Sequence, residues 1–99
     1  MAELLLTFHC SASDAGAIGE ALRGGFGAPV HVREEDVLGL DFSDASTAER
    51  VTARLDRRAI QLVIPDDRLD TAIGVIERLK RSGPVRWQAI PITARGRIA

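Results

Sequence analysis

The stretch RRAIQLVIPDDRLDTAIGVIERLK, residues 57–80, decides the fold of this chain, because it predicts a strand that is followed directly by a helix. Residues 58–64 predict a strand, because Ile60, Leu62 and Ile64 are spaced two apart and would form one buried face. After Pro65 the apolar residues change to helical spacing and form one stripe, namely Leu69, Ala72, Ile73, Ile76 and Leu79. The helix is expected to end at Gly83-Pro84.

The amino-terminal half predicts a similar strand and helix, with an extended segment after them. Residues 3–10 form an apolar run with one face made by Leu4, Leu6, Phe8 and Cys10. Ser11 with Asp14 three residues later resembles a helix N-cap, and Gly24-Gly25 is expected to end that helix. Residues 29–33 and 37–42 predict one long, bent or bulged strand, with the acidic triplet 34–36 at a solvated bend.

The remaining segments complete the order strand, helix, strand, strand, helix, strand. Residues 43–56 are polar and predict either a short helix capped by Ser46 or a loop, and residues 85–92 predict the last strand. Residues 1–99 are therefore expected to form a single α+β domain, a ferredoxin-like βαββαβ sandwich whose antiparallel sheet has both helices on one face. The other face would carry a mixture of apolar and polar side chains, namely Leu5, Thr7, His9, Gln61 and Val63. Such a sheet face is commonly covered by a partner or by self-association.

Composition argues against several classes of protein. Thirteen Lys and Arg against fourteen Asp and Glu leave no basic surplus for nucleic acid. There is no tyrosine, and the predicted open face lacks the aromatic side chains that stack on RNA bases. Thr7 and His9 interrupt the amino-terminal apolar run, so we expect neither a signal peptide nor a membrane span. The single cysteine fits a reducing compartment, and we expect a cytoplasmic protein.

Few residues suggest chemistry. His9, Cys10 and His31 are the candidates for a transition-metal site, but consecutive strand residues point to opposite faces, so a buried thiol and two surface imidazoles are the favoured interpretation. No histidine has a spacing that suggests a catalytic triad and no phosphate-binding glycine motif is present, so we expect no enzyme. The candidate residues for binding an anion are Arg57, Arg58, Arg95 and Arg97, because arginine side chains suit phosphate or carboxylate groups. Arginines that are simply solvated at the surface are the commoner case.

The sequence from Arg57 to Asp70, the helix after it and the segment VRWQAIPITARGRI, residues 85–98, resemble a small bacterial family of P-II-like proteins of unknown function. The second half of the chain carries this resemblance, and the first half shares the order of elements. The resemblance implies a homotrimer whose sheets face the three-fold axis, with a small effector, often a nucleotide, in the clefts between subunits. It thereby implies a regulatory or signalling protein.

By the same resemblance, residues 43–56 match the T-loop that docks onto a transporter or an enzyme. Lys80 to Gly83 take the place of the phosphate-binding loop, which adds Lys80 to the candidate ligand residues, and Arg95 and Arg97 could reach a neighbouring cleft. The glycine-rich phosphate-binding sequence of P-II proteins is absent here. Residues 43–56 contain no Tyr, His or Cys, so the resemblance does not extend to uridylylation or to a metal site in that loop.

Two alternatives stay open beside the regulatory interpretation. Members of the family are often encoded beside heavy-metal efflux systems, which implies a small metal-binding or metal-delivery protein that would use His9, Cys10 or His31. The third hypothesis is a small ferredoxin-like enzyme, which would require a pocket among residues that we assign to the core.

Overall fold

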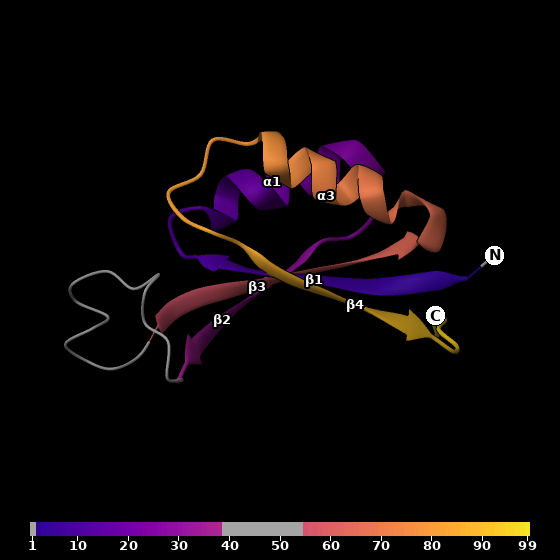
Figure 1. Ribbon diagram of the computed structural model, residues 1–99. Coiled ribbons are helices and arrows are strands. Elements are labelled where there is room, and N and C mark those ends of the chain that lie inside the picture. The colour runs from indigo at the N-terminus through magenta and orange to yellow at the C-terminus, as the bar shows by residue number, and fades with distance from the viewer. Residues whose placement is uncertain (1, 39–54) are drawn as a thin grey trace.

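In this computed structural model, residues 2–38 and 55–99 are described, and within them four strands form one antiparallel sheet with two helices on one of its faces (Figure 1). The elements in chain order are β1 (Glu3–Ser11), α1 (Ala15–Phe26), β2 (His31–Val37), β3 (Leu55–Pro65), the 3-10 turn η1 (Asp66–Arg68), α3 (Leu69–Arg78) and β4 (Arg86–Ile92). The strand order is β2-β3-β1-β4, so β1 and β3 are central and β2 and β4 are edges. The predicted α+β class with an antiparallel sheet is confirmed.

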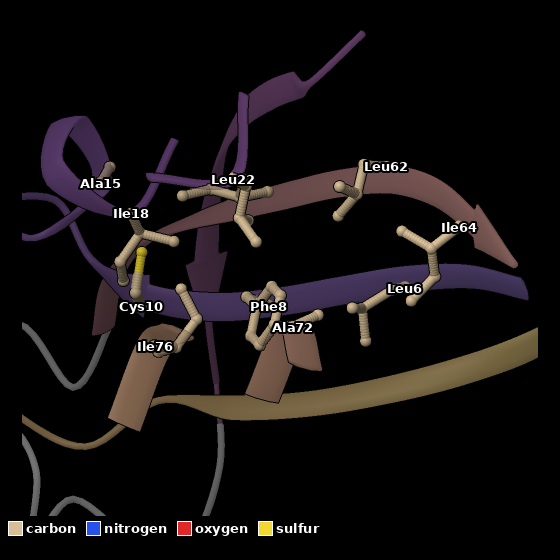
Figure 2. Close-up of a cluster of buried hydrophobic side chains, with 11 residues drawn as sticks. Leu6, Phe8, Cys10, Ala15, Ile18, Leu22, Leu62, Ile64, Ala72 and Ile76 are labelled. Atoms are coloured by element: carbon tan, nitrogen blue, oxygen red, sulfur yellow. The ribbon is translucent and has the colours of Figure 1, made fainter. Parts of the chain in front are cut away.

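The hydrophobic core lies between the sheet and the two helices (Figure 2). Central strands β1 and β3 and both helices supply its large side chains, which are Leu6, Phe8, Ile18, Leu22, Ile60, Leu62, Ile64 and Ile76. Each of these side chains is at most 4% exposed, and burying one contributes roughly 1.5–3 kcal/mol. The alternation predicted for β1 and β3 is therefore confirmed. Leu4, near the start of β1, is only partly buried.

Helix α1 differs from its prediction at both ends. It begins after Asp14 rather than after Ser11, and the Asp14 side chain makes no capping hydrogen bond to its own helix. It continues through Gly24-Gly25 and ends at Phe26, where Gly27 takes a left-handed conformation with φ of 60°. The Gly27 N–H donates to the Arg23 carbonyl at 3.1 Å, which closes the helix, and a left-handed residue of this kind favours glycine.

Strand β2 corrects the prediction of an acidic bend. Glu34 and Glu35 lie inside the strand, where they are the cross-strand partners of Arg58 and Arg57, and opposite charges at such positions stabilise pairing. The predicted continuation to residue 42 and most of the 43–56 segment lie outside the described residues. Leu55 and Asp56 begin β3, so the strand starts earlier than its alternation indicated.

The second predicted helix is confirmed as η1 followed by α3, with Ala72 and Ile76 of the apolar stripe fully or almost fully buried. The predicted end at Gly83-Pro84 is wrong, because α3 ends at Arg78 and Leu79 already has an extended backbone. None of the described helices is both long and apolar enough to cross a membrane.

Candidate functional site

The sheet face that the helices leave open carries a strip without charges. Residues paired across the strands share a face, so the register places Leu5 beside Val63 and Ile90, and Thr7 beside Gln61 and Gln88. We call this set the central strip; its members are Leu5, Thr7, Gln61, Val63, Gln88 and Ile90. The sequence predicted the members from β1 and β3. It missed Gln88 and Ile90, because which side of β4 faces the helices depends on its pairing with β1.

The central strip is partly closed by a hydrogen bond between neighbouring strands. Gln61 Nε2 donates to Thr7 Oγ1 at 3.0 Å, and Thr7 is only 2% exposed although no helix covers it. Ile90 on the edge strand β4 remains 51% exposed. The strip therefore combines satisfied polar groups at its centre with an accessible apolar side chain at its edge.

A hydrogen-bonded pair and an ion pair frame the central strip at its two ends. At one end His9 Nδ1 and Glu35 Oε1 are 2.6 Å apart, although β3 lies between their strands. The contact can cross β3 because Ala59, the partner of His9 in the register, has a small side chain. At the other end Arg95 binds Glu3 with two nitrogens, at 2.9 and 2.7 Å, and this guanidinium lowers the pKa of Glu3. An uncharged centre with a charged rim is the usual composition of a protein interface.

The predicted anion-binding residues divide between the two ends of the sheet. Arg57 and Arg58 lie opposite Ser11 and Cys10, at the end where β1 finishes. Arg58 pairs with Asp56 at 2.7 Å and with Glu34 at 3.7 Å, and Arg57 donates to the Asp56 carbonyl at 3.2 Å. Arg95 is bound to Glu3 at the opposite end. One chain does not gather these side chains into one site.

Lys80 and Arg97 differ from the other basic candidates. Both are exposed, and neither has an ionic partner within residues 2–38 and 55–99. Lys80 lies in the loop that joins α3 to β4, and Arg97 lies in the tail after β4. They are the candidate cations with the greatest freedom to contact an external anion.

A buried carboxylate fixes the loop after α3. Asp14, 7% exposed, accepts the N–H of Ser82 at 2.9 Å and that of Gly83 at 3.3 Å. Burial acts to raise the pKa of Asp14, but hydrogen bonds from the Ser82 and Gly83 backbone and from the hydroxyls of Ser82 and Ser11 outweigh it and hold the pKa below its ordinary value. Asp14 therefore occupies two backbone donors in the loop that the P-II resemblance assigns to phosphate. The sequence indicated only a helix cap, because the partners lie 68 and 69 residues away.

Three serine hydroxyls lie beside this carboxylate. The Oγ atoms of Ser11, Ser13 and Ser82 are 3.0 to 3.2 Å apart in pairs. They join the end of β1 to the same loop, so the contacts of Asp14 and of these hydroxyls hold the 82–83 backbone in one conformation.

The three predicted metal ligands are not brought together. Cys10 points into the core and is 0% exposed, while His9 lies on the open face. Burial raises the pKa of Cys10 to about 11, so its thiol is protonated at neutral pH. His31 is exposed on β2, beyond β3. Within residues 2–38 and 55–99 no three His, Cys, Asp or Glu side chains are grouped as metal ligands would be.

No protein-family model matches the sequence, and no curated protein is significantly similar to it. Solved structures show the same fold at low identity. A DUF3240 family protein from Shewanella baltica OS155 is 12% identical with a TM-score of 0.78, covering 98% of this chain and 97% of that one. A functionally unknown protein from Pediococcus pentosaceus ATCC 25745 is 12% identical with a TM-score of 0.67, covering 99% of both chains.

A Bacillus cereus protein related to NIF3 is also similar, at 15% identity and a TM-score of 0.70 over 97% of this chain. This chain spans only 26% of the length of that protein. At these identities the likeness establishes the small α+β fold, which occurs here both in proteins of similar length and as a part of a larger one.

Proposed function

We propose that this chain is a P-II-like regulatory protein that assembles into a homotrimer through the open face of its sheet and binds a small effector between subunits. The central strip is the observation that carries the proposal. Its uncharged side chains and its charged ends have the composition of an interface, and a second copy would cover Ile90, which is half exposed in the single chain. The number of three subunits follows from the family resemblance alone.

The proposal includes the ferredoxin-like arrangement of the domain. The order β1, α1, β2, β3, α3, β4 and the sheet order β2-β3-β1-β4 support it. Docking of a transporter or enzyme through residues 43–56 belongs to the same proposal, and most of that segment lies outside the described residues.

We expect the effector to be an anion that meets exposed basic side chains of two subunits. Lys80 and Arg97 support this part of the proposal, because both are exposed and neither has an ionic partner within the described residues. A phosphate would not displace Asp14 easily from the 82–83 backbone, so we expect side-chain contacts rather than a backbone cradle. A thermal-shift series with nucleotides and with transition-metal ions tests this, since a ligand at 100 times its Kd adds about 2.7 kcal/mol of stability.

The experiment that tests the assembly compares two substitutions of nearly equal exposure on opposite faces of the sheet. Ile90→Arg places a charge in the central strip, whereas Val32→Arg does so on the helix side of edge strand β2, where Val32 is 53% exposed. We expect sedimentation velocity to show a trimer for the natural protein and for Val32→Arg. Ile90→Arg should sediment as a folded monomer, with its helical circular dichroism retained.

A natural protein that sediments as a monomer at every concentration would disprove the proposed assembly. A trimer that Ile90→Arg leaves intact would place the interface elsewhere on the molecule and remove the argument from the central strip.

A further inference from the structure

A small groove with apolar and charged lining residues runs along the helix side of β4, beside α3. The helices do not fully cover this edge of the sheet, because Trp87, whose register partner is the buried Phe8, remains 47% exposed. The groove has a volume of about 170 Å³, and its apolar lining comes from three strand or loop residues and two helix residues, which are Phe8, Val85, Trp87, Ile73 and Ile76. This volume suits one aliphatic side chain better than a drug-sized ligand, whose pockets begin near roughly 300 Å³.

Two charged residues border this groove. Arg81 is fixed in place, because its Nε donates to the Ile76 carbonyl and its Nη1 to the Gly83 carbonyl, each at 3.1 Å. Glu77 also lines the groove, is exposed, and has no ionic partner in the part of the chain that the structure describes. Arg81 likewise has no acidic partner in the described residues, so the border carries charges of both signs. Arg81 is held by backbone carbonyls, and Glu77 is the group that can pair with a cationic neighbour of the side chain that fills the groove.

The tail after β4 has the complementary composition. Ile98 is 100% exposed, the highest value among the exposed large hydrophobic side chains, and Arg97 precedes it without an ionic partner in the described segments. Arg95, two residues earlier, is bound to Glu3. The tail thus has a fixed base and carries a cation followed by an uncovered aliphatic side chain.

The fixed base of the tail disfavours docking within the same chain. Glu3 and Phe8 are five residues apart on β1, about 17 Å along the strand. The three residues from Arg95 to Ile98 span at most about 11 Å. Arg95 is held at the Glu3 end of β1, whereas Trp87 lies beside Phe8, further along the same strand. A second copy of the chain can bring its tail to the groove without this restriction.

We propose that the tail of one copy inserts Ile98 into the Trp87 groove of the next copy, with Arg97 paired to Glu77. This inference rests on the proposed function, which already requires self-association, and it assigns Arg97 to Glu77, so that Lys80 remains as the exposed cation for the effector. The contact joins two different surfaces, tail and groove, so it is heterologous and closes into a ring when the rotation between copies permits. An aliphatic anchor against a tryptophan in a small pocket is a typical energetic centre of an interface.

The chain contains its own reporter for this contact. Trp87 is the only tryptophan and there is no tyrosine, so intrinsic fluorescence reports the groove alone. We expect Ile98→Asp in the full-length chain to shift the tryptophan emission to longer wavelength and to raise the dissociation midpoint of the oligomer at least tenfold, roughly the effect of losing one anchor residue. Ile98→Leu is the matched control and should keep the emission and the midpoint of the natural protein.

A charge exchange tests the partner residue. Arg97→Glu and Glu77→Arg should each weaken the oligomer, and the double variant should recover part of the loss, which a nonspecific effect of tail charge would not produce. If Ile98→Asp leaves a trimer with unchanged emission, the tail contact is disproved and the proposed function stands. If the natural protein is monomeric at all concentrations, both fail. An emission shift that is unaffected by dilution would show docking within one chain and would also overturn the inference.

Discussion

The two faces of β1 and β3 come from the same stretches of sequence and are stabilised differently. On the covered face Leu6, Phe8 and Leu62 are at most 1% exposed and pack against both helices (Figure 2). The open face combines apolar neighbours such as Leu5 and Val63 with polar contacts, as in the hydrogen bond from Gln61 to Thr7 and the pairing of His9 with Glu35. The side chains of the covered face are thus buried within one chain, whereas the open face has side-chain atoms that a second molecule could contact.

The covered side also has a polar contact at a buried carboxylate, which we call the clasp. Asp14 joins the start of α1 to the loop after α3, so the helix layer is held to the end of the sheet by two hydrogen bonds as well as by its core. We therefore expect substitutions on the covered side to change the stability of the single chain. Substitutions on the open side should mainly change assembly.

The largest effect is expected in the core. Phe8→Ala should lower the free energy of unfolding by about 3–5 kcal/mol, because it leaves a cavity between the sheet and both helices. Leu5→Ala, three residues earlier on the open face, should cost less than about 2 kcal/mol at low protein concentration, where the open face is solvated. Urea unfolding followed by circular dichroism measures both values.

Equal losses for these two substitutions at every protein concentration would contradict the proposed difference between the two faces. A loss for Leu5→Ala that grows with protein concentration would support it, because assembly would then bury Leu5.

An intermediate effect is expected at the clasp. Asp14→Ala should cost about 1–3 kcal/mol at neutral pH, since it leaves the N–H groups of Ser82 and Gly83 without their acceptor. The pKa of Asp14 is lower in the folded chain than its ordinary value of 3.8, so its contribution is present above that value and is lost as the pH falls through the folded pKa. Urea unfolding at neutral pH and near pH 3 should therefore show a smaller acid-induced loss for Asp14→Ala than for the natural protein.

Glu3→Gln is the control for this pH dependence, because Glu3 also has a lowered pKa but is exposed at the other end of the sheet. A full acid-induced loss in Asp14→Ala would mean that the clasp does not contribute to acid sensitivity.

The smallest effect on the single chain is expected on the open face. His9→Gln removes the pair with Glu35 and should change the free energy of unfolding by less than about 1 kcal/mol, because both side chains are partly solvated. Sedimentation velocity should show a larger effect on assembly, since the pair lies at the rim of the central strip. A loss of several kcal/mol in the monomer would show that the bridge over Ala59 is a structural part of the sheet.

Most of the fold could be predicted from local patterns. The alternation of Ile60, Leu62 and Ile64 and the stripe through Ala72 and Ile76 each place apolar atoms on one side of a regular element, and that side has to be buried. Element ends were harder. Gly24-Gly25 was expected to end α1, but a glycine ends a helix only where the backbone takes the left-handed conformation, and Gly27 takes it here.

The candidate site depended more on long-range contacts. The residues of β1 and β3 on the open face followed from alternation, whereas Glu35 beside His9 and Ser82 beside Asp14 did not. The acidic triplet, residues 34–36, was predicted to form a solvated bend, because the sequence alone did not show which basic residues would lie beside it. Pairing of β2 with β3 supplies Arg57 and Arg58 as those partners.

The amino-acid sequence alone was enough to predict the type and order of the described elements and the apolar side of most of them, because these depend on spacing within one segment. The tertiary structure decided which strands are neighbours, and with that the reach of His9 across Ala59, the clasp at Asp14 and the exposure of Trp87 in a groove beside α3. The physical reason is that hydrogen bonds, ion pairs and cavities depend on distances in space, and the chain brings residues 26 and 68 positions apart into contact only when it folds.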